Sequence, residues 1–345
     1  MTNRTPNRQS NIELLRIVAM FLVLVLHALF IAIGTPSQSQ CLFDPGNALA
    51  RLFFQSLAIV AVDIFVLISG WFGIKPTLKK LLSLFFQVFF FTITILTVFG
   101  FIRGFGNISI GSILKSLMIT KGYWFIKSYI CLFILSPVLN LFAEKADKRT
   151  FSLVLICFFA FQTIYGWTDS APEFSYGCSV VSFAGLYLLA RYLRFYPLRL
   201  LSKRGLCLSV YLALSLILAY IVWELIAQDF YTDHSVSVAF SYINPLVVIS
   251  SLALFFTFVN TEVPYSKTIN WIATSAFSVY IIHINGFLFP YFRETVWYIY
   301  SHYPTVARGV LILFFLMAVF SICVLWDKIR LSVWRMAEKL FSKES

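Results

Sequence analysis

The sequence is divided into long apolar segments, and this feature constrains the fold more than any other. A segment of about 20 apolar residues is long enough to cross the hydrocarbon core of a bilayer as a helix. Ten such segments are expected, at 14–33, 48–74, 81–102, 122–143, 151–167, 177–195, 205–226, 239–259, 270–290 and 305–326. The sequence therefore predicts an all-α, polytopic transmembrane bundle of about ten helices. We expect one domain over residues 1–345, with a basic cytoplasmic tail at about 327–345.

The composition agrees with a membrane protein, because 60% of the residues are hydrophobic and only 12% are charged. Membrane lipids are thus expected to surround the chain. A net charge of +12 could suggest nucleic acid, but the basic residues lie in short loops between apolar segments and indicate topology instead. The six cysteines form no Cys-x-x-Cys pair, so no metal site is expected.

The loops between the predicted helices alternate in charge. One set, which includes both termini, carries most of the Lys and Arg residues, among them Lys75, Arg191 and Arg204, whereas Asp169 falls in the other set. The positive-inside rule then places both termini in the cytoplasm, and we expect the cytoplasmic (inner) membrane of a bacterium. The segment 103–121 fits either an outer loop or a re-entrant segment.

Two ionisable residues, Arg16 and His27, lie in the first apolar segment. They are 11 positions apart, which in an α-helix brings them to the same face, about three turns and about 16 Å apart. Charged groups inside a membrane normally face protein or a wet cavity. Histidine can transfer a proton near neutral pH, and arginine can bind an anionic group. A histidine that only hydrogen-bonds a neighbouring helix, and an arginine that only anchors the helix end, are the alternatives.

The second apolar segment contains one carboxylate, Asp63, and a Ser69-Gly70 pair near its end. Asp63 could orient His27 as carboxylates orient catalytic imidazoles, or it could form a structural pair. Ser69-Gly70 permits a close backbone approach or a kink. The lysines that follow, at positions 75, 79 and 80, mark topology or contact a phosphate-rich cosubstrate.

The ninth segment contains Ser278, Tyr280 and His283, which do not share one narrow helical stripe. They would line a cavity only if protein surrounds the helix. His283 is a candidate functional residue or a structural one. His302 belongs to a predicted outer loop, where we expect it to be solvated.

Together these motifs resemble the acyltransferase-3 family of integral-membrane acyltransferases. Arg16 and His27 match an arginine-x10-histidine motif, and VDIFVLISGW matches the motif of the second span. Tyr123-Trp124-Phe125 with Pro137, and the series from Ser278 to His283, are weaker matches. Members often carry an arginine-x-x-arginine after the second span, where this chain has the three lysines.

The resemblance implies a donor, acyl-CoA, that arrives from the cytoplasm, and catalysis by His27 with support from Arg16. It predicts an O-acyltransferase, in particular an O-acetyltransferase, that uses acetyl-CoA as cosubstrate and no permanently bound cofactor. The expected acceptor is a hydroxyl of a cell-surface or lipid-linked polysaccharide. Catalytic residues would be His27, Arg16, Asp63 and His283, donor contacts would be Arg16, Lys75, Lys79 and Lys80, and pocket residues would be Ser69, Gly70, Trp124, Ser278 and Tyr280. The rival hypothesis is a proton-coupled transporter or exporter of a glycan or small solute, because intramembrane Arg, His and Asp serve proton coupling equally well.

Overall fold

The computed structural model describes residues 9–107, 109–111, 113, 123–230 and 233–341. Within these ranges the chain is helical and contains no strand, as the sequence predicts. The chain forms two compact units. Unit 1 comprises Met1–Lys75 and Ser128–Asn270, and unit 2 comprises Pro76–Lys127 and Trp271–Ser345. The prediction of one domain stays a prediction.

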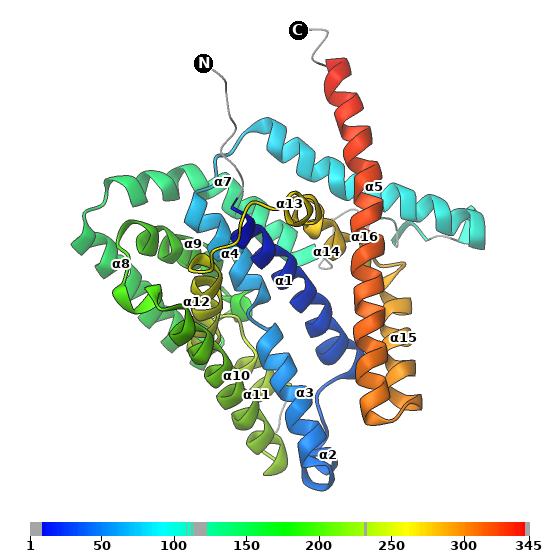
Figure 1. Ribbon diagram of the computed structural model, residues 1–345, viewed down its shortest axis with the longest axis horizontal. Coiled ribbons are helices and arrows are strands. Elements are labelled where there is room, and N and C mark those ends of the chain that lie inside the picture. Colours follow the sequence, from blue (N-terminus) through cyan, green and yellow to red (C-terminus); the bar gives the residue numbers. More distant parts are fainter. Residues whose placement is uncertain (1–8, 108, 112, 114–122, 231–232, 342–345) are drawn as a thin grey trace. The chain divides into compact units, whose positions relative to one another are not determined.

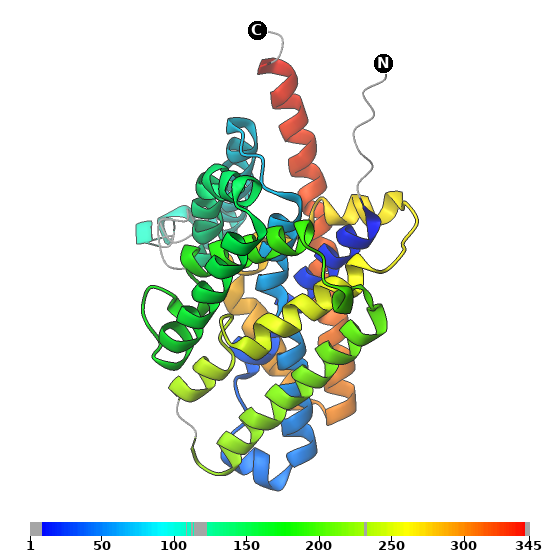
Figure 2. The same ribbon diagram turned by 90° about the vertical axis from the view of Figure 1, so that its left-hand side faces the viewer.

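Unit 1 contains the first span and most of the middle of the chain. Its α-helices are α1 (Ser10–Leu26), α2 (Gln38–Phe43), α3 (Pro45–Ala58), α4 (Ala61–Phe72), α8 (Lys148–Phe161), α9 (Val180–Phe195), α10 (Arg204–Ala227), α11 (Asp233–Ala239) and α12 (Pro245–Val259), together with most of α7 (Trp124–Lys145). Two π-helical segments, η1 (His27–Ile33) and η4 (Gln162–Thr168), extend α1 and α8, and short 3-10 turns lie at Ser175–Gly177 and Arg199–Ser202. Figures 1 and 2 show α10 and α12 running side by side.

Helix α4 is the central helix of unit 1. It packs against α1, α9 and α12, and nine of its residues are buried. A helix that is apolar on nearly every side requires protein on nearly every side. The predicted second span, 48–74, is divided between α3 and α4 by a turn at residues 59 and 60. Asp63 therefore lies in the first turn of the buried helix α4, three residues after this break.

Within unit 1, hydrogen bonds join loops that the sequence predicts on the same side of the membrane. On the side predicted for the N-terminus, Asn11 donates to the carbonyl of Phe258, and Asn260 donates to the carbonyl of Leu201. On the opposite side, Gln38 donates to the carbonyl of Ala227. Loops expected on one side of the membrane thus contact each other. Which of the two sides is cytoplasmic stays a prediction.

Unit 2 contains α5 (Leu78–Arg103), the 3-10 turn Phe105–Asn107, α14 (Ala276–His283), α15 (Phe289–His302), α16 (Thr305–Phe341) and the end of α13 (Lys267–Ala273), whose first four residues belong to unit 1. Helix α16 packs against α5, α14 and α15. A buried cluster of polar side chains lies between α5 and α16. Within α16, Arg330 Nε donates to Asp327 Oδ1 at 2.6 Å. Gln87 donates to the same Asp327 oxygen at 3.4 Å.

Seven helices in the described part of the chain are long and apolar enough to cross a membrane. They are Ser10–Ile33, Pro45–Phe72, Leu78–Arg103, Trp124–Lys145, Lys148–Thr168, Arg204–Ala227 and Thr305–Met336. The remaining predicted spans correspond to shorter helices: α9 has 16 residues, α12 has 15, and the segment 270–290 contains α14 with 8. At 1.5 Å per residue, 16 residues reach about 24 Å, less than the hydrocarbon thickness of about 30 Å. The count of ten spans is therefore not confirmed.

Besides the short helices α2 and α11, two longer segments outside the predicted spans are helical. Residues 289–302, expected as an outer loop, form α15, and residues expected as a basic tail continue α16 to Phe341. The segment 103–121 cannot be assigned as loop or re-entrant, because residues 108, 112 and 114–121 lie outside the described residues.

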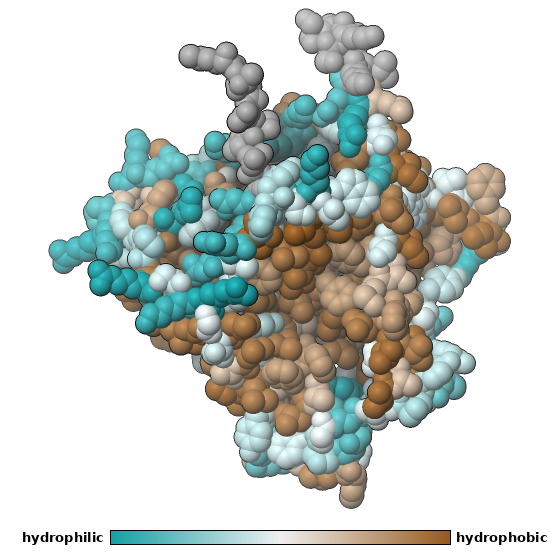
Figure 3. Space-filling view, in the orientation of Figure 1, coloured by the Kyte–Doolittle hydropathy of each residue, from teal (hydrophilic) through white to brown (hydrophobic). Residues whose placement is uncertain are grey.

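The surfaces of the long helices suit lipid. Exposed apolar side chains follow one another along α16, among them Val310, Phe314, Met317 and Leu325, and apolar surface covers much of this helix in Figure 3. The start of α8, between two predicted spans, has a polar helix cap. The Asp147 carboxylate accepts hydrogen bonds from the backbone N–H and the hydroxyl of Thr150, and these bonds lower the pKa of Asp147.

Candidate functional site

Arg16 and His27 share one face of α1. The helix is regular from Ser10 to Leu26, and the His27 N–H still donates to the carbonyls of Val23 and Leu24. Met20 and Val23 lie on the same stripe between the two residues, and their side chains are buried, with 1% and 5% exposed. Arg16 and His27 are themselves half-buried. The stripe that joins the two residues therefore faces protein.

His27 is the first residue of the π-helix η1. π-Helical turns are rare and occur frequently at functional sites, because they widen the helix and interrupt its regular hydrogen bonding. Gly34 ends this segment with φ +84°, a conformation that favours glycine. Arg51 of α3, which is buried, donates to the Gly34 carbonyl at 2.8 Å and to Gln40 Oε1 at 3.1 Å. Arg51 thus anchors the end of the first span.

The acidic residue that approaches Arg16 within the described ranges is Glu13, on its own helix. Arg16 Nη1 lies 3.8 Å from Glu13 Oε1, which is too long for a hydrogen bond. The Arg16 side chain is 36% exposed. Its guanidinium group can therefore accept a further anionic partner.

Asp63 is fully buried, and its partner comes from α12. The Ser251 hydroxyl lies 3.1 Å from Asp63 Oδ2 and donates to the carbonyl of Val247 at 2.8 Å. Among the described residues Asp63 Oδ1 has no hydrogen-bond partner. Ser251 was not predicted as a site residue, although a Ser250-Ser251 pair in an apolar segment was the available signal. A direct pairing of Asp63 with His27 stays a prediction, and Oδ1 is the oxygen that could serve it.

Ser69 and Gly70 bring α4 close to α9, as the Ser-Gly pair predicts. A Cβ atom at Gly70 would lie only 2.4 Å from the carbonyl oxygen of Tyr187 and 2.9 Å from Ala190 Cβ. Ser69 donates to the Phe65 carbonyl at 2.8 Å, and the Tyr129 hydroxyl lies 3.3 Å from Ser69 Oγ. Gly70 has a packing role, whereas Ser69 presents a polar group that Tyr129 engages.

In unit 2, three candidate residues lie on the buried helix α14. His283 Nδ1 is 2.5 Å from the Val279 carbonyl, a distance that fits an Nδ1–H donor and leaves Nε2 as the second ring nitrogen. Ser278 donates to the Ser275 carbonyl at 2.6 Å and approaches the Cys323 carbonyl of α16 at 3.4 Å. Tyr280 instead packs its ring against other aromatic rings, those of Tyr123, Phe125, Phe277 and His283. Ser278 and Tyr280 therefore engage different neighbours, as their spacing predicts.

The remaining candidates of unit 2 are Trp124 and two lysines. Trp124 begins α7, is half-buried, and its ring lies 6.0 Å from that of Phe125. Lys79 and Lys80 are exposed at the start of α5. Lys79 Nζ forms a salt bridge of 3.2 Å with Glu338 Oε1 of α16, so a donor phosphate would have to compete with this carboxylate. Lys75, at the end of unit 1, is exposed as well.

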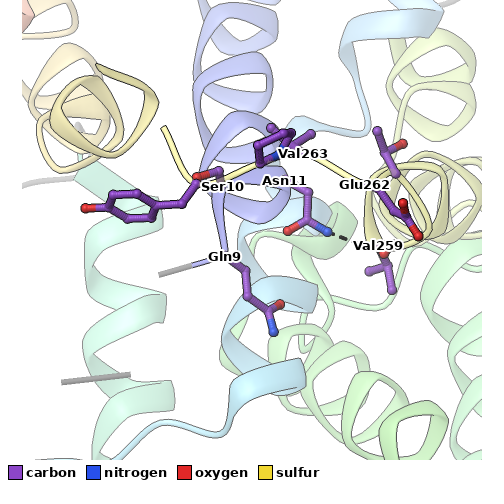
Figure 4. Close-up of a pocket in the computed structure, with 9 residues that line it drawn as sticks. Gln9, Ser10, Asn11, Val259, Glu262 and Val263 are labelled. Atoms are coloured by element: carbon purple, nitrogen blue, oxygen red, sulfur yellow. Dashed lines mark hydrogen bonds between the residues drawn. The ribbon is translucent and has the colours of Figure 1, made fainter. Parts of the chain in front are cut away.

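A surface hollow of about 660 Å³ lies where α1 begins and α12 ends (Figure 4). The side chains drawn around it include Gln9, Asn11 and Glu262, and Asn11 donates to the backbone of α12. Its nine lining residues, all within the described ranges, include one carboxylate and no lysine or arginine. The hollow therefore does not suit an anionic ligand.

A model of one protein family, described as an acyltransferase domain, matches residues 9–327. The match begins just before α1 and includes every candidate residue of both units. No curated protein and no solved structure matches the sequence.

Proposed function

Because this chain belongs to the acyltransferase-3 family and is a membrane acyltransferase, we propose that it transfers an acetyl group from cytosolic acetyl-CoA to a hydroxyl of a cell-surface or lipid-linked polysaccharide. The observation that carries this proposal is the shared, protein-facing stripe of α1 that holds Arg16 and His27. On this stripe an imidazole and a guanidinium lie three turns apart within one membrane-spanning helix.

His27 acts as the general base. It removes the proton of the acceptor hydroxyl as the oxygen attacks the thioester carbonyl, the C–S bond breaks, and coenzyme A leaves as the thiol after taking up a proton. General-base catalysis of this kind contributes about 10²–10⁴-fold to the rate. The π-helical turn that begins at His27 and the anchor of Arg51 on Gly34 support a fixed position for the imidazole.

Of the other candidate residues, some bind the donor and one stabilises the imidazole of His27. Arg16 binds an anionic group of acetyl-CoA, supported by its half-exposed guanidinium and its long distance to Glu13. Lys75, Lys79 and Lys80 attract the donor phosphates. Asp63 stabilises the positively charged imidazole through the oxygen that Ser251 does not engage.

The candidate residues of α14 and α7 in unit 2 are proposed to contact the acceptor. Tyr280 and Trp124 supply aromatic surface, which suits the apolar faces of a sugar ring. Ser278 stabilises α14 through its hydrogen bond to the Ser275 carbonyl. His283, whose Nδ1 is bonded to the Val279 carbonyl, is the candidate for a second proton transfer. The chain would operate in the inner membrane with both termini in the cytoplasm.

The proposal is tested by mass spectrometry of surface glycans from cells that carry the wild-type chain, His27→Ala, or no chain. We expect an acetyl-sized mass on glycans only with the wild type. His302→Ala is the matched control, because this histidine is exposed at the end of α15 and should leave acetylation unchanged. Immunoblots of membranes check that all variants are present in equal amounts.

Two outcomes would contradict the proposal. Normal glycan acetylation by His27→Ala would reject the general base, and unmodified glycans with the wild type would reject the acceptor class. Transport of a glycan without consumption of acetyl-CoA would favour an exporter instead.

A further inference from the structure

Three hydrogen bonds fix the chain where it leaves α4. The Ile74 N–H donates to the Tyr187 hydroxyl at 2.8 Å, and that hydroxyl donates to Asn140 Oδ1 at 2.6 Å. The Asn140 amide nitrogen then donates to the Ile74 carbonyl at 2.8 Å. The preceding residue, Gly73, has φ +72°, which favours glycine. The end of α4 is therefore held rigidly against α7 and α9.

Arg191 lies one turn beyond Tyr187 on α9, against this fixed backbone. A Cβ atom at Gly73 would be 2.9 Å from Arg191 Nη1, so the guanidinium packs directly over the glycine. Only 8% of Arg191 is exposed. Its Nη2 is 3.6 Å from Glu144 Oε1, too long for a hydrogen bond, and within the described part of the chain its Nε has no hydrogen-bond partner. A buried guanidinium with unsatisfied N–H groups is unfavourable without a further acceptor.

Arg194 lies three positions further along α9, on the same side of the helix. It is exposed, and its guanidinium lies 4.7 Å from the ring centre of Trp71. Trp71 is itself buried and packs against Phe255 and Phe256 of α12, with ring distances of 5.5 and 5.6 Å. Stacking on a fixed ring limits the orientations of the guanidinium and leaves its N–H edge available.

These groups form a positively charged site within unit 1. Arg191, Arg194 and the exposed Lys75 gather around the end of α4, and Glu144 is the carboxylate that approaches Arg191. Planar arginine groups bind phosphate through paired N–H···O bonds. The phosphates are the anionic groups of acetyl-CoA, while its pantetheine arm is uncharged. From Gly73 back to Asp63, the length along α4 is about 15 Å at 1.5 Å per residue.

We propose that Arg191 and Arg194 bind the phosphate groups of the acyl-CoA donor at the end of α4, so that the uncharged arm extends along this helix toward Asp63. The inference rests on the proposed function, because it assigns the donor site of that reaction. It adds two arginines that the sequence assigned only to topology, and it gives the buried Arg191 Nε the acceptor that it lacks among the described residues.

The test compares acetyl-CoA with acetyl-pantetheine, which carries the same thioester without phosphates. The quantity measured on purified full-length protein is the ratio of kcat/KM with acetyl-CoA to kcat/KM with acetyl-pantetheine. Arg191→Gln and Arg194→Gln should each lower this ratio by about tenfold or more, because each variant loses one charge-assisted hydrogen bond to a phosphate. Arg191→Lys should recover part of this ratio. Arg199→Gln, an exposed arginine beyond the end of α9, is the control and should match the wild type.

Direct binding of coenzyme A, measured by calorimetry on the same detergent-solubilised proteins, separates this inference from the proposed reaction. Wild-type binding that weakens about tenfold or more in Arg194→Gln supports the inference even if no acceptor is acetylated. Equal binding by the wild type and both glutamine variants, or no binding by the wild type, would overturn it. Arg194 is exposed, so its variant stays informative if Arg191→Gln does not fold.

Discussion

Replacing Gly70 with alanine tests the close contact between α4 and α9 on which the geometry of unit 1 depends. The added Cβ would lie 2.4 Å from the Tyr187 carbonyl oxygen, whereas ordinary van der Waals contact begins near 3.4 Å. The obstacle is backbone, so no side-chain rotation relieves it, and the two helices must separate by about 1 Å. Overpacking of this kind costs about 1–3 kcal/mol.

The helix propensity of alanine partly offsets this cost, by about 1 kcal/mol relative to glycine. Gly205→Ala in α10 isolates that gain, because a Cβ there meets nothing within 4 Å. We expect Gly70→Ala to be less stable than Gly205→Ala by about 1–3 kcal/mol. The assay is equilibrium unfolding of the full chain in mixed micelles with increasing sodium dodecyl sulfate.

The reasoning would be refuted if both alanine variants had the same free energy of unfolding, or if Gly70→Ala were the more stable. Either result would mean that α4 and α9 lie farther apart than the distances to Tyr187 and Ala190 indicate.

Two further variants address the same helix. Tyr187→Phe removes the hydroxyl that accepts the Ile74 N–H, so we expect a loss of about 1–3 kcal/mol in the same unfolding assay; a value equal to that of Tyr196→Phe would argue against the three-bond arrangement. Asp63→Asn keeps the shape of the side chain and its contact with Ser251 but removes the charge, so kcat should fall by about tenfold or more with the protein still folded. An unchanged kcat would limit Asp63 to a structural role.

The sequence predicts the long spans well because a continuous apolar run has one stable arrangement in lipid. The expected ranges 81–102 and 205–226 differ by only a few residues from α5 and α10. Helix α15 could not be predicted from an apolar run, because Arg293, Glu294 and the polar residues at its end interrupt its apolar sequence. The turn between α3 and α4 was missed because its residues, Ile59 and Val60, are as apolar as those of the helices on either side.

The candidate site could be predicted only where one helix determines it. The shared face of Arg16 and His27 follows from helical spacing, and the close approach at Gly70 follows from the small residue. Contacts between segments far apart in the sequence cannot be predicted in this way. Ser251 is 188 positions from Asp63, and the burial of Arg51 and Arg191 depends on helices that the spacing of basic residues does not reveal.

The measurement that tests the central claim most directly is the release of free coenzyme A thiol from acetyl-CoA by purified protein in liposomes that contain a glycan acceptor. The account predicts acceptor-dependent release by the wild type and by His302→Ala, and a decrease of about 10²–10⁴-fold in His27→Ala. Release by His27→Ala at the rate of His302→Ala would contradict it.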